Sequence, residues 1–274
     1  DGAELAKLLE KEKKRFKGNE LQGRTLGIVG LGAIGSMIAR AALDLGMQVI
    51  GYDPALSVDA AWRLPSAVQK MENIGSLFAK ADFITLHLPV FDSTRGMVNA
   101  DLLGNCRPGT CLLNFAREEI VNIDAVVEAL NAGRLRKFIT DFPTPELIGR
   151  NDVILMPHIG ASTDEAEENC AIMAANQLDD FLRNGNISNS VNFPALYLER
   201  SGECRLAVAN HNVPKILGSI LGILSDANIN IVDMLNKSRD EIAYNLIDLA
   251  SDVGEELLEQ IAALEGVINV RLIR

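Results

Sequence analysis

The chain has 274 residues, 48% of them hydrophobic, and a formal net charge of −11 at pH 7. This length allows one large or two modest domains with apolar cores. The acidic balance argues against a nucleic acid or an anionic membrane as partner. In the sequence no apolar run approaches the roughly 20 residues that span a bilayer. The cysteines follow no regular spacing, so we expect reduced thiols, a cytoplasmic protein and no metal framework; they are Cys106, Cys111, Cys170 and Cys204.

The first stretch, from Ala3 to Phe16, is amphipathic and strongly charged, which predicts a helix. The chain starts at Asp1 rather than at a methionine, and the helical pattern begins at once. We therefore expect the chain to be the interior of a longer polypeptide.

A glycine-rich motif follows the first predicted strand, residues 25–29, and opens a predicted helix, residues 34–45. Gly30, Gly32 and Gly35 fit the pattern G-x-G-x-x-G. The first glycine makes a tight turn, the second lets backbone amides approach a pyrophosphate, and the third lets the helix pack on the strand. Free amides at the helix start, Ala33 and Ile34, attract phosphates. An ordinary glycine-rich turn is the alternative reading.

A second predicted strand, residues 47–51, leads to Asp53. Its carboxylate can accept hydrogen bonds from both ribose hydroxyls of a dinucleotide, and its charge repels a 2′-phosphate. The cofactor predicted from this motif is therefore NAD rather than NADP.

Strands and helices then alternate along the chain. The predicted strands are 82–89, 110–115, 138–141 and 153–156, and the predicted helices are 74–79, 99–103 and 123–131. This order predicts an α/β fold with a doubly wound parallel sheet, a Rossmann-like domain over residues 1–163. Functional groups are expected at the carboxyl ends of its strands.

The last third of the chain has a different pattern. A long helix, 164–184, and a polar linker form a connecting segment over residues 164–200. A βαββαβ unit over residues 201–274 follows. Its predicted strands are 205–209, 229–236, 242–249 and 267–273, and its predicted helices are 214–226 and 255–263.

Three polar residues follow strand ends: Arg117, Glu146 and His158. Arg117 would bind a substrate carboxylate and polarise the oxygen on C2. His158 would remove the hydroxyl proton as hydride leaves C2. Glu146, hydrogen-bonded to the imidazole, would orient it and favour its charged form. Each also has a plainer reading, as a surface ion pair, a solvated loop carboxylate and a capping or core histidine respectively.

Residues 114–117 (NFAR), 141–146 (DFPTPE) and 156–163 (MPHIGAST) resemble signature segments of the D-isomer-specific 2-hydroxyacid dehydrogenases. The resemblance implies the three catalytic roles above. Among members of this family, those that convert 3-phospho-D-glycerate to 3-phosphohydroxypyruvate in serine biosynthesis match best. The cofactor-binding residues implied are Gly30, Gly32, Ala33, Ile34, Gly35, Asp53, His87, Pro89, Ala116, Arg117, Asp141, His158 and Gly160.

The βαββαβ unit resembles an ACT domain, a module that senses small molecules. The resemblance implies that Asn210, Asn212 and Asn230 bind an L-serine effector across a pair of such domains. The alternative is that these asparagines only cap turns. Since a lone four-stranded sheet leaves exposed edges, we expect a homodimer or homotetramer.

Three residues differ from those usual in the family: Glu118 and Lys215 each replace a glycine, and Asn210 replaces a histidine. The family's N-terminal segment, which forms most of the substrate domain, is absent, so we expect the cofactor half of a cleft. Three other functions stay open. They are a dehydrogenase for another 2-hydroxy acid, a non-catalytic NAD sensor similar to the C-terminal-binding-protein corepressors, and a fragment that only binds cofactor and effector.

Overall fold

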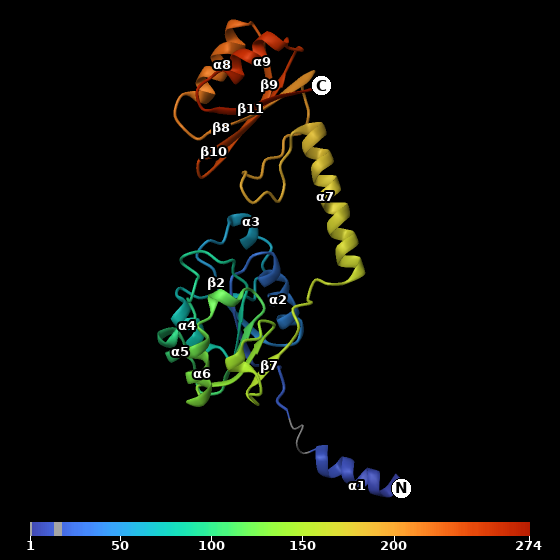
Figure 1. Ribbon diagram of the computed structural model, residues 1–274, viewed down its shortest axis with the longest axis vertical. Helices are drawn as coiled ribbons and strands as arrows, with labels where there is room; N and C mark the ends of the chain where they lie inside the picture. Colours follow the sequence, from blue (N-terminus) through green and yellow to red (C-terminus); the bar gives the residue numbers. More distant parts are fainter. Residues whose placement is uncertain (1, 14–17) are drawn as a thin grey trace. The chain divides into compact units, whose positions relative to one another are not determined.

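The computed structural model describes residues 2–13 and 18–274 and divides the chain into two compact units, residues 1–159 and 160–274 (Figure 1). The helix predicted over 3–16 is α1, Gly2–Glu12; residues 14–16 of that prediction lie outside the described residues. The connecting segment predicted over 164–200 falls within the second unit. None of the helices in the described ranges is long and apolar enough to cross a membrane.

Over residues 18–159 the first unit forms a seven-stranded sheet in the order β3-β2-β1-β4-β5-β6-β7. Every pair of neighbouring strands is parallel, which confirms the predicted fold class. The strand order reverses beside β1, and ligands bind at such a switch point in doubly wound sheets. The strands are β1 (Thr25–Val29), β2 (Gln48–Tyr52), β3 (Gln69–Lys70), β4 (Phe83–Leu86), β5 (Thr110–Asn114), β6 (Leu135–Thr140) and β7 (Val153–Leu155).

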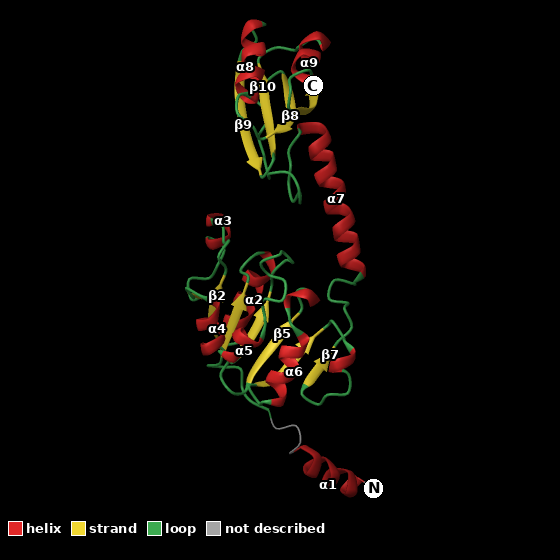
Figure 2. Ribbon diagram, turned by 60° about the vertical axis from the view of Figure 1, so that its left-hand side comes forward, coloured by secondary structure: helices red, strands yellow, loops and turns green. Residues whose placement is uncertain are grey.

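Helices cover both faces of this sheet (Figure 2). Leu77, Phe78 and Val126 belong to one apolar cluster, on the face of α4, α5 and α6, and Ala39 and Ala42 of α2 belong to another. Asparagine side chains cap α4, α5 and α6 by accepting a bond from an amide three residues on. The helices are α2 (Ala33–Asp44), α3 (Val58–Ala61), α4 (Ile74–Lys80), α5 (Ala100–Gly104) and α6 (Ile123–Asn131), with short 3₁₀ turns at Glu118–Ile120 and Pro145–Leu147.

Some predicted boundaries were wrong. β4 ends at Leu86 rather than at residue 89, because its neighbour β1 ends at Val29, which pairs with Leu86. β6 begins at Leu135 rather than at residue 138, since two charged residues near its start obscure the apolar pattern. The short elements α3 and β3 were not predicted.

The second unit contains a four-stranded antiparallel sheet in the order β11-β8-β10-β9. Its elements follow the predicted order strand, helix, strand, strand, helix, strand. One face packs on α8 and α9 through an apolar cluster that includes Leu206, Val208 and Ile220. The elements are β8 (Cys204–His211), α8 (Ile216–Asp226), β9 (Ile231–Arg239), β10 (Ile242–Leu249), α9 (Glu255–Ala262) and β11 (Val267–Ile273).

The long helix α7, Asp164–Asn184, precedes this sheet. The side chain of Thr163 caps its start, and Gly185, with φ 74°, ends it. Three side chains of the sheet bind carbonyls at the C-terminal end of α7, where Phe181 O also accepts from the backbone N–H of Gly185. Arg271 donates to Phe181 O, Arg205 to Asn184 O and Tyr244 to Gly185 O. We call Arg205, Tyr244 and Arg271 the α7 clamp.

A buried ion pair supports this clamp. Arg205 and Asp248 are 0% and 1% exposed, and two bonds of 2.5 and 2.8 Å join them. The backbone N–H and the hydroxyl of Ser201 donate to the same carboxylate. Burial raises the pKa of Asp248, but the bonds from Arg205 and Ser201 outweigh it and hold this pKa below its ordinary value.

Candidate functional site

The glycine-rich turn lies directly after β1, where only glycine fits at two positions. Gly30 has φ +92°, and a Cβ there would lie 2.2 Å from the carbonyl oxygen of His87. A Cβ at Gly35 would lie 2.0 Å from the carbonyl oxygen of Gly30, so this glycine permits the close packing of α2 on the turn. A Cβ at Gly32 would meet no described atom within 4 Å. Gly32 therefore borders open space, as a residue that lets a ligand approach the backbone must.

The start of α2 borders the same space. Gly32 is its N-cap residue, and no side chain among the described residues caps the helix. Ala33 and Ile34 form the first turn and are exposed. The first turn of a helix carries N–H groups without partners in the helix, and they attract phosphate.

Asp53 lies at the end of β2, next to this turn. Its Oδ2 accepts a bond of 2.9 Å from the backbone N–H of Leu31, and its Oδ1 accepts one of 2.9 Å from Ala55. Each carboxylate oxygen can accept a second bond. Asp53 is thus held in one orientation and still has acceptor capacity for ribose hydroxyls.

His87 follows β4 and lies beside Gly30. Its N–H donates to Val29 O at 2.7 Å, and its Nε2 is 3.0 Å from the hydroxyl oxygen of Thr85. Burial lowers the pKa of His87, which favours the neutral ring. Pro89 is exposed two residues further, and its carbonyl accepts a bond from the Thr94 hydroxyl.

Arg117 lies on the turn after β5, which Asn114 holds in place. The Asn114 side chain accepts from Ala116 N at 3.2 Å and donates to Arg117 O at 2.9 Å. Ala116 is buried, whereas Arg117 is exposed. A surface pocket of about 580 Å³ separates Glu118, which follows this turn, from Glu146 on the loop after β6.

The carboxylate that contacts His158 is Asp141. Nδ1 of His158 is 2.9 Å from Oδ2 of Asp141, whereas no bond from Glu146 to this ring is present among the described residues, so the orienting role of Glu146 stays a prediction. Asp141 directly follows β6 and His158 follows the neighbouring β7, whereas Glu146 lies five residues beyond Asp141. Glu146 is exposed, and its own backbone N–H lowers the pKa of its carboxyl. The sequence signal for Asp141 was its place directly at a strand end.

Asp141 also has a free acceptor. Its side chain is 10% exposed, and Oδ1 is buried with no hydrogen-bond partner among the described residues. A buried acceptor without a donor suits a ligand that brings one, and the carboxamide of a nicotinamide carries such a donor. Gly160 is exposed and belongs to the second unit, so its place in the cofactor site stays a prediction.

In the second unit, Asn210 lies at the end of β8 and is buried. It donates to His211 O at 2.7 Å and accepts from Asn245 at 2.7 Å, and Asn245 accepts in turn from Asn236 at 2.6 Å. These three amides form a chain across three strands. Sequence reasoning missed Asn236 and Asn245, although the two residues pair in register on β9 and β10.

The three predicted effector residues are not together within one chain. Asn212 is exposed and donates to Asp240 O at 3.1 Å, near Asn210. Asn230 precedes β9, and its carbonyl accepts from Ala250 N, just past the end of β10. The register of β9 and β10 places that point at the opposite end of the sheet from Asn210.

Comparison with known proteins gives a family for the first unit. The model of the NAD-binding domain of D-isomer specific 2-hydroxyacid dehydrogenases matches residues 3–160. The D-3-phosphoglycerate dehydrogenase of Haemophilus influenzae is 33% identical over an alignment of 267 positions, which covers 93% of this chain and 64% of that protein. The enzyme of the same name from Methanocaldococcus jannaschii is 33% identical over 88% of this chain and 46% of that protein. The chain therefore spans less than two thirds of the length of these relatives.

Solved structures agree with this match. A glyoxylate reductase from Paecilomyes thermophila has a TM-score of 0.58 at 27% identity and covers 64% of this chain and 54% of its own. A D-lactate dehydrogenase from Aquifex aeolicus, solved with NAD and lactic acid, has a TM-score of 0.53 at 25% identity, over 64% of this chain and 61% of its own. With the family match to an NAD-binding domain, the predicted cofactor, NAD, is confirmed.

Proposed function

We propose that this chain, which belongs to the family of D-isomer specific 2-hydroxyacid dehydrogenases, converts 3-phospho-D-glycerate and 3-phosphohydroxypyruvate with NAD. One observation carries the choice of substrate. The match to D-3-phosphoglycerate dehydrogenases covers 93% of the chain, so it continues well past residue 160 into the second unit.

The strand-end residues have the chemistry that this reaction needs. NAD, when bound, accepts the hydride that leaves C2 of the hydroxy acid. The exposed guanidinium of Arg117 can bind the substrate carboxylate through two parallel bonds. Since Nδ1 of His158 is engaged with Asp141, Nε2 is the nitrogen left to take the hydroxyl proton, and to return it in the reverse direction.

Asp141 and Glu146 are two candidates for the carboxylate that orients His158. The contact of 2.9 Å supports Asp141. The family resemblance supports Glu146, with Asp141 serving the nicotinamide through its free Oδ1. Both residues therefore stay in the proposed site, and the variants described in the Discussion separate their roles.

We further propose that the second unit is an ACT-like module that binds L-serine between two copies. β9 is an edge strand of the sheet and is largely exposed. Two β9 strands paired antiparallel would place the start of each opposite the end of the other. Asn230 of a second copy would then lie at the same end of the joined sheet as Asn210 and Asn212. This pairing accounts for the distance between these residues within one chain and implies at least a dimer.

The substrate is tested by following NADH absorbance with 3-phosphohydroxypyruvate, pyruvate and glyoxylate in parallel. We expect 3-phosphohydroxypyruvate to be reduced fastest and His158→Gln to remove the activity. His211→Gln changes a histidine of the other unit and should leave the rate unchanged. Faster reduction of another keto acid would favour a different 2-hydroxyacid dehydrogenase. Binding of NADH without reduction of any of the three would favour a fragment that only binds cofactor and effector, or the non-catalytic sensor.

The effector proposal has a separate test. Calorimetry should detect L-serine binding that Asn212→Ala and Asn230→Ala each weaken by at least about tenfold, the loss expected when a bound polar group loses its partner. Sedimentation should show a dimer or a larger species. A monomer, or serine binding that both variants leave intact, would contradict the proposal.

A further inference from the structure

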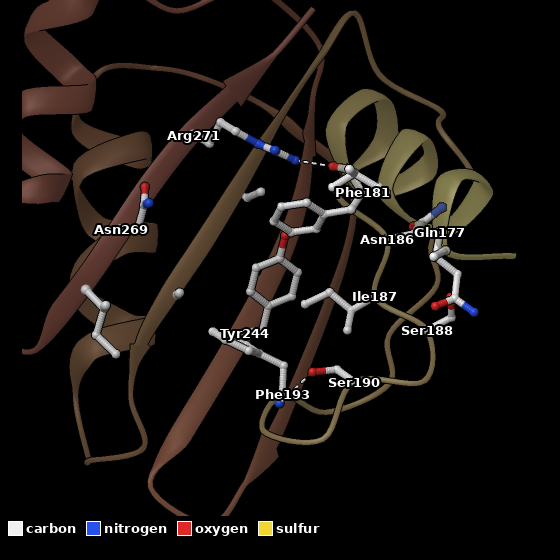
Figure 3. Close-up of a pocket in the computed structure, with 15 residues that line it drawn as sticks. Gln177, Phe181, Asn186, Ile187, Ser188, Ser190, Phe193, Tyr244, Asn269 and Arg271 are labelled. Atoms are coloured by element: carbon white, nitrogen blue, oxygen red, sulfur yellow. Dashed lines mark hydrogen bonds between the residues drawn. The ribbon is translucent and has the colours of Figure 1, made fainter. Parts of the chain in front are cut away.

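A second cavity lies within the second unit, on the face of the sheet opposite α8 and α9. It has a volume of about 580 Å³ and lies between α7, the loop 186–193 and the sheet (Figure 3). We call it the α7 pocket. Its apolar walls include Leu178 and Phe181 of α7, Ile187 and Phe193 of the loop, and Ala209 and Tyr244 of the sheet.

The walls of the α7 pocket are held in place by contacts of the protein itself. Tyr244 and Arg271 line the pocket and also belong to the α7 clamp, which binds the last carbonyls of the helix. The rings of Phe193 and Tyr244 meet edge to face, with centroids 6.0 Å apart. The N–H of Phe193 donates to the hydroxyl of Ser190. The cavity is thus preformed, and its volume is that of a small-molecule site.

The charge of the lining selects the kind of ligand. Among the described residues that line the pocket, Arg271 is the only charged one, and none is acidic. Its guanidinium lies 4.4 Å from the centre of the Phe181 ring and donates to Phe181 O through Nη2. A guanidinium carries five N–H groups, so donors remain for a second acceptor. Asp180 lies outside the lining and bonds to Asn184 and Asn186.

We propose that the α7 pocket binds a small carboxylate with an aromatic or branched apolar body. The carboxylate bonds to Arg271, and the apolar body lies against Phe181, Phe193 and Tyr244. This site is separate from the glycine-rich turn of the first unit and from the asparagines at the end of β8. It does not suit L-serine, which lacks an apolar body. Its ligand contacts α7, the loop and the sheet together, and so stabilises the attachment of α7.

Calorimetry on the whole chain tests the proposal, with 3-phenylpropionate as the probe. The neutral 3-phenylpropanamide has the same shape and should bind about tenfold more weakly, because a hydrogen bond to a charged group is worth more than a neutral one. Arg271→Gln should remove this preference. Equal binding of the acid and the amide, or a preference that survives Arg271→Gln, would overturn the assignment.

A second pair of variants covers the case that Arg271→Gln unfolds the unit. Ala174 lines the pocket from an exposed position on α7, and Ala175 is exposed but does not line it. Ala174→Trp should fill the pocket and abolish binding of 3-phenylpropionate, whereas Ala175→Trp should not. Undiminished binding by Ala174→Trp would place the probe elsewhere and refute the site. L-serine should not compete with the probe, so a failed effector proposal leaves this test intact.

Discussion

In the parallel-sheet unit, some polar side chains at the strand ends are exposed or lack a hydrogen-bond partner, whereas in the antiparallel unit polar side chains of the sheet are bonded to one another. Arg117 and His158 are exposed, and Oδ1 of Asp141 has no partner among the described residues. Arg205 and Asp248, by contrast, are almost fully buried and bound to each other. Partly satisfied polar groups are available to a ligand, whereas fully satisfied ones fix the structure. The comparison predicts that substitutions of these strand-end residues act on binding, and that substitutions of the buried pair act on folding.

The largest expected effect is that of Asp248→Ala. It leaves the guanidinium of Arg205 buried without its partner, which typically costs about 3–5 kcal/mol. Urea unfolding of the second unit should report this loss. Asp252→Ala removes an exposed pair with Arg274 and serves as the control, since it should change stability little. Equal effects of the two variants would contradict the structural role of the buried pair.

The same pair predicts a dependence on acid. Because the pKa of Asp248 is held below its ordinary value of 3.8 in the folded state, its contribution to stability is present above that pH and is lost as the pH falls through the folded pKa. Unfolding of the second unit, followed by circular dichroism during acidification, should show this loss below pH 3.8. The curve of Asp248→Ala should lack it. If the unchanged protein and Asp248→Ala lost stability in the same way below this pH, a group other than Asp248 would be responsible for the loss.

The glycine-rich turn allows folding and binding to be separated. A Cβ at residue 35 would meet backbone at 2.0 Å, so Gly35→Ala should destabilise the first unit by about 1–3 kcal/mol, as overpacking does. Gly32→Ala meets nothing within 4 Å and should leave stability within about 0.5 kcal/mol. It should nevertheless weaken NADH binding, measured by fluorescence titration. Unchanged NADH affinity in Gly32→Ala would contradict the prediction that the pyrophosphate binds next to Gly32.

A smaller effect distinguishes Asp141 from Glu146. Asp141→Asn removes the carboxylate oxygen that lies 2.9 Å from Nδ1 of His158, so the ring loses the contact that fixes its orientation for reduction of the keto acid. The rate should drop at least about tenfold, a part of the roughly 10²–10⁴-fold that a positioned acid–base group contributes. Glu146→Gln should lower the rate less than Asp141→Asn does; a larger loss in Glu146→Gln instead would assign the orienting role to Glu146.

The smallest effect concerns the backbone before α8. Lys215 has φ 78°, a conformation that favours glycine. A left-handed conformation costs an L-residue roughly 1–2 kcal/mol. Replacement by glycine removes this cost, but glycine loses more conformational entropy on folding, which offsets part of the stabilisation. Lys215→Gly should therefore stabilise the second unit by about 0.5–1 kcal/mol in urea. Asn228→Gly, at φ 58°, should stabilise the second unit less than Lys215→Gly does, because asparagine tolerates this conformation.

The sequence predicted those parts of the fold that local pattern controls. The glycine-rich turn, the buried strands β1 and β5 and the helix α7 all have strong periodicity or clear caps. Elements of two to four residues, α3 and β3, have no periodicity to detect. The position of a strand end such as Leu86 depends on where the neighbouring strand ends. The residues around Leu86 alone do not carry this information.

The candidate site was predictable as a set of residues but not as a set of contacts. Arg117, Glu146 and His158 were found because they follow strand ends, and Asp141 was implied by the family resemblance. Which carboxylate contacts the imidazole depends on the order of β6 and β7 in the sheet, so the contact of Asp141 with His158 was not foreseen. The pair of Arg205 and Asp248 joins residues 43 positions apart, so only the antiparallel register of β8 and β10 reveals it.

The attachment of α7 has a mechanical consequence. The helix has 21 residues and no buried side chain within its described length, and at 1.5 Å per residue it extends over about 31 Å. Its C-terminal end is held by the α7 clamp. Such a rod acts as a lever: a tilt of roughly 10° at the clamp displaces the end near Thr163 by about 5 Å. A small change of angle at the clamp would therefore displace the far end of the helix by about the size of a side chain.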